Sequence, residues 1–152
     1  MVITADRGYE SYALIVWLIS NGIPFVIRGR DIHSNGIASS VQNLPEGEFD
    51  TDWDVLLTNR RTKETLGKPE KYKVLNQIQF ERIPEMYELH LRIVRVQLSE
   101  DSYEILLTNL GREEFAEESL KEIYSSRWGI EVEYLKLKYR IGLNRFQSKN
   151  RI

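Results

Sequence analysis

The sequence predicts an α/β fold that is α+β overall, and three regions of the chain lead to this prediction. The first 30 residues contain an apolar run, a helical pattern and a second apolar run. The middle of the chain is rich in Val, Ile and Leu with polar residues between them, as in strands. Residues 111–152 have a helical pattern and a basic end. A length of 152 residues suits one domain with a buried core.

The N-terminal region predicts a strand, a helix and a second strand. Residues 2–5 form a short buried strand that ends at Asp6, and residues 9–20 form a mostly buried helix. The pair Asn21-Gly22 ends this helix, and residues 25–28 form the next strand. Two strands joined in this way are parallel, with a right-handed crossover.

Residues 31–69 are rich in turn formers and predict an irregular segment. Five acids cluster in it beside Trp53. Their spacing lacks the ordered loop of a calcium-binding hand motif, so a solvated loop is expected rather than a metal site. The five acids are Glu46, Glu48, Asp50, Asp52 and Asp54.

The β-rich middle continues with strand-like patterns over residues 72–83, 87–98 and 103–108. The turn formers at residues 99–102 join the last two strands in a predicted hairpin. Asn109-Leu110-Gly111 then separates this part from the helical end, which is expected from Arg112 onward.

Composition excludes several classes of protein. The chain has no cysteine, which excludes disulfides and thiolate metal sites and favours the cytoplasm. No apolar run reaches the ~20 residues of a membrane span. The net charge of −2 conceals a basic tail, because residues 134–152 contain six Lys or Arg and no acid. Such a tail, with its aromatic residues, suits a phosphate backbone or is a solvated basic end.

The predicted C-terminal helix carries Tyr124, Arg127, Glu131 and Lys138 within a stripe about 60° wide, since each residue turns the helix by about 100°. Leucines share this stripe, so the polar groups can line a cleft. Alternatively, Arg127 and Glu131 form an ordinary pair four residues apart on an exposed helix face. The geometry alone leaves both readings open.

The spacing of these four residues resembles the tyrosine–arginine–glutamate–lysine (YREK) signature of a group of bacterial insertion-sequence DDE transposases. These enzymes have a ribonuclease H-like catalytic core. The stretch "TADRGYES" (4–11) resembles the strand end that carries the family's second catalytic aspartate. "PFVIRGRD" (24–31) is similar to the strand that follows, and "LLTNL" (106–110) to the segment that leads into the glutamate helix.

The resemblance implies a partial ribonuclease H-like core with an inserted antiparallel β-rich region. Residues 1–30 would be the core strand-helix-strand unit with the second aspartate, and residues 31–110 the insertion. Residues 111–152 would be the glutamate helix and basic tail. The family's first aspartate lies on an earlier strand, so one incomplete domain that lacks the N-terminal strands is expected.

For function, the resemblance implies a fragment of a transposase catalytic domain. The intact enzyme would cleave DNA and transfer strands with two Mg²⁺ or Mn²⁺ ions. Asp6 and Glu131 would be catalytic residues and metal ligands. The DNA-binding residues would be Tyr124, Arg127, Lys138, Arg140 and Arg145.

The implied partner is double-stranded DNA at transposon ends, bound by a homodimer in the full-length synaptic complex and associated with the bacterial nucleoid. The chain alone is expected to be inactive. One alternative is a truncated, non-catalytic product that binds DNA or another subunit. Another is a plain α/β domain in which the stripe is structural and Asp6 caps a turn or helix.

The remaining candidate side chains are expected to be structural. Trp53 is assigned to a loop or the core, and Trp17 and Trp128 to the core. His33 and His90 have no partner at metal-ligand spacing.

Overall fold

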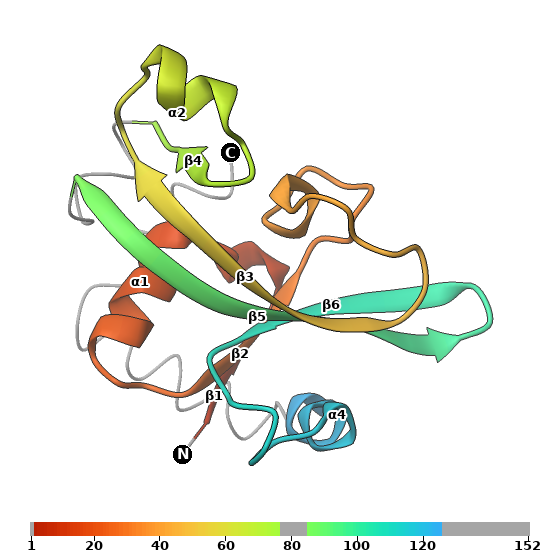
Figure 1. Ribbon diagram of the computed structural model, residues 1–152. Coiled ribbons are helices and arrows are strands. Elements are labelled where there is room, and N and C mark those ends of the chain that lie inside the picture. Colours follow the sequence, from red (N-terminus) through yellow and green to blue (C-terminus); the bar gives the residue numbers. More distant parts are fainter. Residues whose placement is uncertain (1, 77–84, 126–152) are drawn as a thin grey trace.

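The α/β prediction is confirmed by a computed structural model, which describes residues 2–76 and 85–125 (Figure 1). Six strands form one mixed sheet in the order β1-β2-β6-β5-β3-β4, an arrangement consistent with a partial ribonuclease H-like core. The strands are β1 (Ile3–Ala5), β2 (Phe25–Gly29), β3 (Phe49–Thr58), β4 (Tyr72–Val74), β5 (Met86–Ser99) and β6 (Ser102–Thr108). The α-helices are α1 (Tyr12–Ser20), α2 (Lys63–Gly67) and α4 (Glu117–Ser125), and the 3₁₀ helices are η1 (Arg7–Tyr9) and η2 (Ala38–Ser40).

The N-terminal strand-helix-strand unit forms as predicted, with β1 parallel to β2. The predicted helix over residues 9–20 is shorter, because Ser11 accepts a hydrogen bond from the Leu14 amide (3.4 Å) and α1 starts after it. The residues just before Ser11 form η1 instead. Gly22 ends the helix region with φ 64°, a conformation that glycine adopts without strain.

The prediction of an irregular segment over residues 31–69 is wrong for residues 49–58. These residues form β3, a strand of ten residues. It pairs with β5 along its whole length, from Phe49↔Arg95 to Thr58↔Met86. The physical reason is an alternation with period two: Trp53 is 6% exposed and packs in the core, whereas its neighbours Asp52 and Asp54 are exposed. The acidic run is therefore not wholly a solvated loop, because its last three members, Asp50, Asp52 and Asp54, belong to β3.

The predicted hairpin is confirmed as β5–β6, with Ile93 opposite Leu107. β6 also pairs antiparallel with β2, so it joins the N-terminal unit to the rest of the sheet. Asn109 reinforces this junction: its Oδ1 accepts from the Phe25 amide, and its Nδ2 donates to the Ile23 carbonyl, both at 3.0 Å. Residues 72–74 of the strand expected over residues 72–83 form β4. Residues 77–84 lie outside the described part of the chain.

Apolar side chains fill both faces of the sheet. Helix α1 covers one face with Leu14, Ile15 and Leu18, each 0% exposed. Leu120 of α4, also 0% exposed, packs on the opposite face with residues such as Val26 and Val94. Burial of one leucine stabilises a fold by roughly 1.5–3 kcal/mol, so Leu120 fixes α4 on the sheet. None of the described helices has the length and apolar character needed to cross a membrane.

Candidate functional site

Asp6 directly follows β1 and lies at the edge of the sheet where β1 and β2 both end. In open α/β sheets, ligands bind at this carboxyl edge. The Asp6 carbonyl accepts from the Tyr9 amide (3.0 Å), but its side chain makes no capping hydrogen bond to η1. Capping of η1 by this half-buried carboxylate is therefore not supported.

Glu10 fixes the segments that follow β1 and β2 to each other. Its Oε1 accepts from the Arg30 amide (3.1 Å) and its Oε2 from the Ile37 amide (2.8 Å). Burial raises the pKa of the Glu10 carboxyl, and the two amides together with the Arg30 charge oppose that rise. The carboxylate thus supports the wall of the carboxyl edge through backbone groups.

Gly36 allows this close approach and gives a testable prediction. A Cβ at Gly36 would lie 2.8 Å from the Arg30 Cβ and 2.9 Å from Glu10 Oε2. We expect Gly36→Ala to lower the free energy of unfolding by about 1–3 kcal/mol, as measured by urea denaturation. Gly47→Ala is the matched control, because a Cβ there meets nothing within 4 Å and should change stability by less than about 0.5 kcal/mol. Equal stabilities of the two variants would contradict this role of Gly36.

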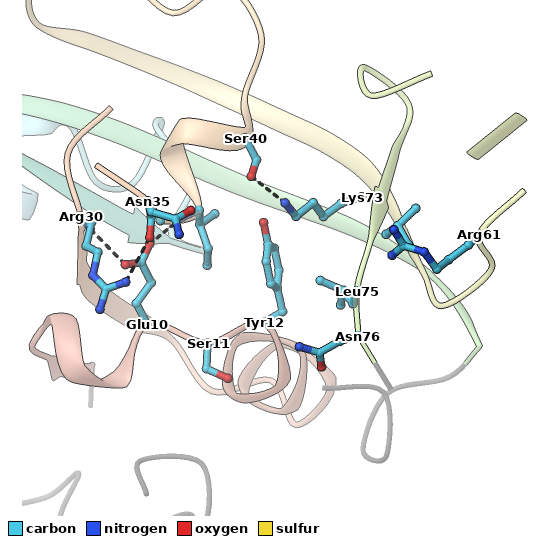
Figure 2. A pocket seen from close by; sticks show the side chains of 13 residues that line it. Glu10, Ser11, Tyr12, Arg30, Asn35, Ser40, Arg61, Lys73, Leu75 and Asn76 are labelled. Carbon is cyan, nitrogen blue, oxygen red and sulfur yellow. Dashed lines mark hydrogen bonds between the residues drawn. The ribbon is translucent and has the colours of Figure 1, made fainter. Parts of the chain in front are cut away.

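A cavity of about 430 Å³ opens beside Glu10, and we name it the Tyr12 cavity. In Figure 2 the Tyr12 hydroxyl points toward Ser40 and the Lys73 ammonium. Lys73 Nζ donates to Ser40 Oγ at 3.0 Å. The full lining is Glu10, Ser11, Tyr12, Arg30, Asn35, Gly36, Ile37, Ser40, Arg61, Lys73, Val74, Leu75 and Asn76. Sequence reasoning missed this cavity because its walls come from segments far apart in the chain.

Arg92 fixes the segment that leads into α4. Its guanidinium is 4% exposed and makes two hydrogen bonds to Asp50, at 2.8 and 2.6 Å. It also donates to the carbonyls of Leu110 (3.1 Å) and Phe115 (2.7 Å). Arg112 bonds Asp50 as well, at 2.8 Å. β3, β5 and the segment before α4 are therefore held by one cluster of charges.

The charges of this cluster also set the ionisation of Asp50. Burial raises the pKa of Asp50, but the hydrogen bonds and charges of Arg92 and Arg112 outweigh it and bring the pKa below its ordinary value. In the sequence, this cluster could have been found from Arg92, which stands between apolar residues of a predicted strand. A buried arginine requires an acidic partner.

The structure describes two of the seven predicted site residues. Asp6 lies at the carboxyl edge, and the backbone of Tyr124 belongs to α4, which contacts β2 and β5. The other five lie outside the described residues, so the approach of Asp6 to Glu131 stays a prediction. These five are Arg127, Glu131, Lys138, Arg140 and Arg145.

Within residues 2–76 and 85–125, no group of three His, Cys, Asp or Glu side chains could hold a metal ion by itself. Magnesium commonly binds through one or two carboxylates and completes its shell with water and substrate phosphates. Asp6 supplies a carboxylate of the required kind, and a second carboxylate would have to come from outside these residues.

The remaining candidates from the sequence have structural surroundings. Trp53 packs in the core against Tyr12, with ring centroids 6.4 Å apart, and Trp17 is partly buried there. His33 pairs with Glu46 (2.9 Å), and His90 pairs with Asp54 (2.5 Å). Trp128 lies beyond the described part.

Comparison with protein-family models matches residues 2–152 to the family described as "Transposase DDE domain". Comparison with curated proteins and with solved structures gave no significant match.

Proposed function

This chain belongs to the transposase DDE domain family, and from this membership we propose that it forms part of the catalytic core of a DNA transposase. The observation that carries the proposal is the position of Asp6 after β1, at the carboxyl edge of a parallel strand pair. Helix α4, which precedes Glu131 in the sequence, is fixed on the adjoining sheet by Leu120.

In this proposal, Asp6 and Glu131 are catalytic residues that hold Mg²⁺ or Mn²⁺ ions with the DNA phosphates. Such ions activate an attacking oxygen and stabilise the leaving oxygen of a phosphodiester. The chain's own basic and polar groups bind and orient the phosphates on either side of the cleaved bond. We assign this role to Tyr124, Arg127, Lys138, Arg140 and Arg145.

A further carboxylate completes the proposed site from a strand beside β1. In the described part of the chain, β1 pairs with β2 along one edge and with no strand along the other. Its three residues are nevertheless at most 1% exposed. An open edge with buried side chains favours the addition of another strand. We assign to that strand the first catalytic aspartate, and to the intact enzyme strand transfer on transposon ends as a homodimer.

The test is a cleavage assay on labelled duplex DNA with Mg²⁺ or Mn²⁺. The 152-residue chain should bind DNA in a salt-sensitive way without cutting it, because the carboxylate set is incomplete. A longer chain that adds the strand beside β1 should nick the DNA. Robust Mg²⁺-dependent cleavage by the 152-residue chain would contradict the incomplete site. A longer chain that binds but never nicks would instead favour a non-catalytic DNA-binding product.

A further inference from the structure

The Tyr12 cavity contains positive charge that carboxylates do not neutralise. In the described part of the chain, neither Lys73 nor Arg61 forms an ion pair with an acidic side chain. Among the residues that the structure describes, Lys73 makes one hydrogen bond, to the neutral Ser40 hydroxyl, and it is partly buried. An ammonium group has three donors, so Lys73 retains capacity for an anionic ligand.

The Tyr12 hydroxyl is a second, independent sign of a ligand. Tyr12 is 6% exposed, and its hydroxyl has no hydrogen-bond partner of ordinary geometry among the described residues. The Ser40 hydroxyl lies near enough to affect its ionisation but does not satisfy it. A buried hydroxyl without a partner costs roughly 1–3 kcal/mol. A tyrosine hydroxyl is protonated at neutral pH, and burial raises the pKa of Tyr12 further, so this hydroxyl can donate a hydrogen bond to an anion.

Glu10, the acid in the cavity wall, does not take the place of such an anion. Each of its two oxygens already accepts a backbone amide, from Arg30 and from Ile37. Figure 2 shows Glu10 on the side of Arg30, with Tyr12 between Glu10 and Lys73. The donors of Tyr12 and Lys73 are thus available on the other side of the cavity.

We propose that the Tyr12 cavity binds a phosphate group of the DNA, with Lys73 and the Tyr12 hydroxyl as donors and Arg61 as a further cation of its wall. The cavity lies beside the segments that follow β1 and β2. Glu10, which lines it, is four positions after Asp6 in the sequence. A strand cut at Asp6 could therefore place a neighbouring phosphate in the cavity. The choice of DNA as the phosphate source rests on the proposed function, whereas the anion site itself rests on the cavity.

The test is DNA binding by the full 152-residue chain without metal, measured by fluorescence anisotropy over a salt series. Lys73→Met should weaken binding about tenfold and lower the salt dependence by about one unit of slope. Tyr12→Phe removes one neutral donor and should weaken binding about fivefold without loss of stability. Lys71→Met is the matched control, since Lys71 is an exposed cation outside the cavity lining, and it should show less than a twofold effect.

The outcomes separate this proposal from the proposed function. DNA binding by Lys73→Met and Tyr12→Phe at the level of the unmodified chain would overturn the cavity as a DNA phosphate site, even if the transposase assignment holds. If the unmodified chain does not bind DNA, titration with inorganic phosphate in an NMR experiment decides. Shifts at Tyr12 and Ser40 that disappear in Lys73→Met would keep the anion site, and their absence would overturn it.

Discussion

Asp6→Asn is expected to lower the rate of Mg²⁺-dependent DNA nicking by on the order of a thousandfold in the longer chain that includes the strand beside β1. The substitution keeps the shape of the side chain but removes the negative charge that a metal ligand requires. The near-identical size of the two side chains should leave the fold intact. Glu131→Gln should have a similar effect on the rate.

The rate is best measured on a labelled duplex, with DNA binding in EDTA as a parallel readout that both variants should leave unchanged. Asp54→Asn is a suitable control, because this aspartate is 67% exposed and pairs with His90 on the outside of the sheet. Nicking by Asp6→Asn at the rate of the unmodified protein would refute the catalytic role of Asp6.

Asp50→Asn is expected to lower the free energy of unfolding by about 3 kcal/mol. The variant leaves the Arg92 guanidinium, which is 4% exposed, without its carboxylate partner. Removal of one member of a buried ion pair is costly because the remaining charge stays out of water. Urea denaturation measures this loss of stability. The substitution should also loosen the segment before α4, since Arg92 binds the Leu110 and Phe115 carbonyls.

The exposed pair of Arg60 and Glu85 gives the control for this prediction. Both side chains are more than half exposed, 59% and 60%, so Glu85→Gln should lower the urea midpoint far less than Asp50→Asn does. An Asp50→Asn variant as stable as Glu85→Gln would show that the cluster around Arg92 does not stabilise the fold.

The same aspartate sets part of the acid sensitivity of the fold. The folded state lowers the pKa of Asp50 below its ordinary value, so the unfolded chain takes up the proton first as the pH falls. The stabilisation is therefore complete above the unfolded pKa of roughly 3.9 and disappears as the pH falls through the lower folded value. Asp50→Asn should flatten the decline of the melting temperature in this acidic range.

The parts of the fold that the sequence predicted correctly depend on contacts between neighbouring segments. The β1-α1-β2 unit and the β5–β6 hairpin each need a local apolar pattern and a turn, and both are visible in the chain. β3 was missed because acids are uncommon in strands and dominated the reading of residues 46–54. Its partner β5 supplies Arg92, which makes a strand with an acidic face stable.

The candidate site was predictable to a smaller extent. Asp6 could be found from a motif next to a predicted strand, because its position depends on local structure. The Tyr12 cavity could not, since Lys73 and Ser40 are 33 residues apart and meet only when β4 joins the sheet beside β3. The roles of Glu131 and of the basic residues after it depend on a part of the chain outside the described residues.

The junction between β2 and β6 has a consequence for the order of folding. Phe25 and Asn109, which close this junction, are 84 residues apart in the sequence. During synthesis, β2 therefore leaves the ribosome long before its neighbour β6 and exposes an unpaired edge in the meantime. Such long-range pairing gives a high contact order, which slows folding and exposes strand edges to aggregation. The β5–β6 hairpin can form locally, and its docking onto β2 would then be the step that completes the sheet.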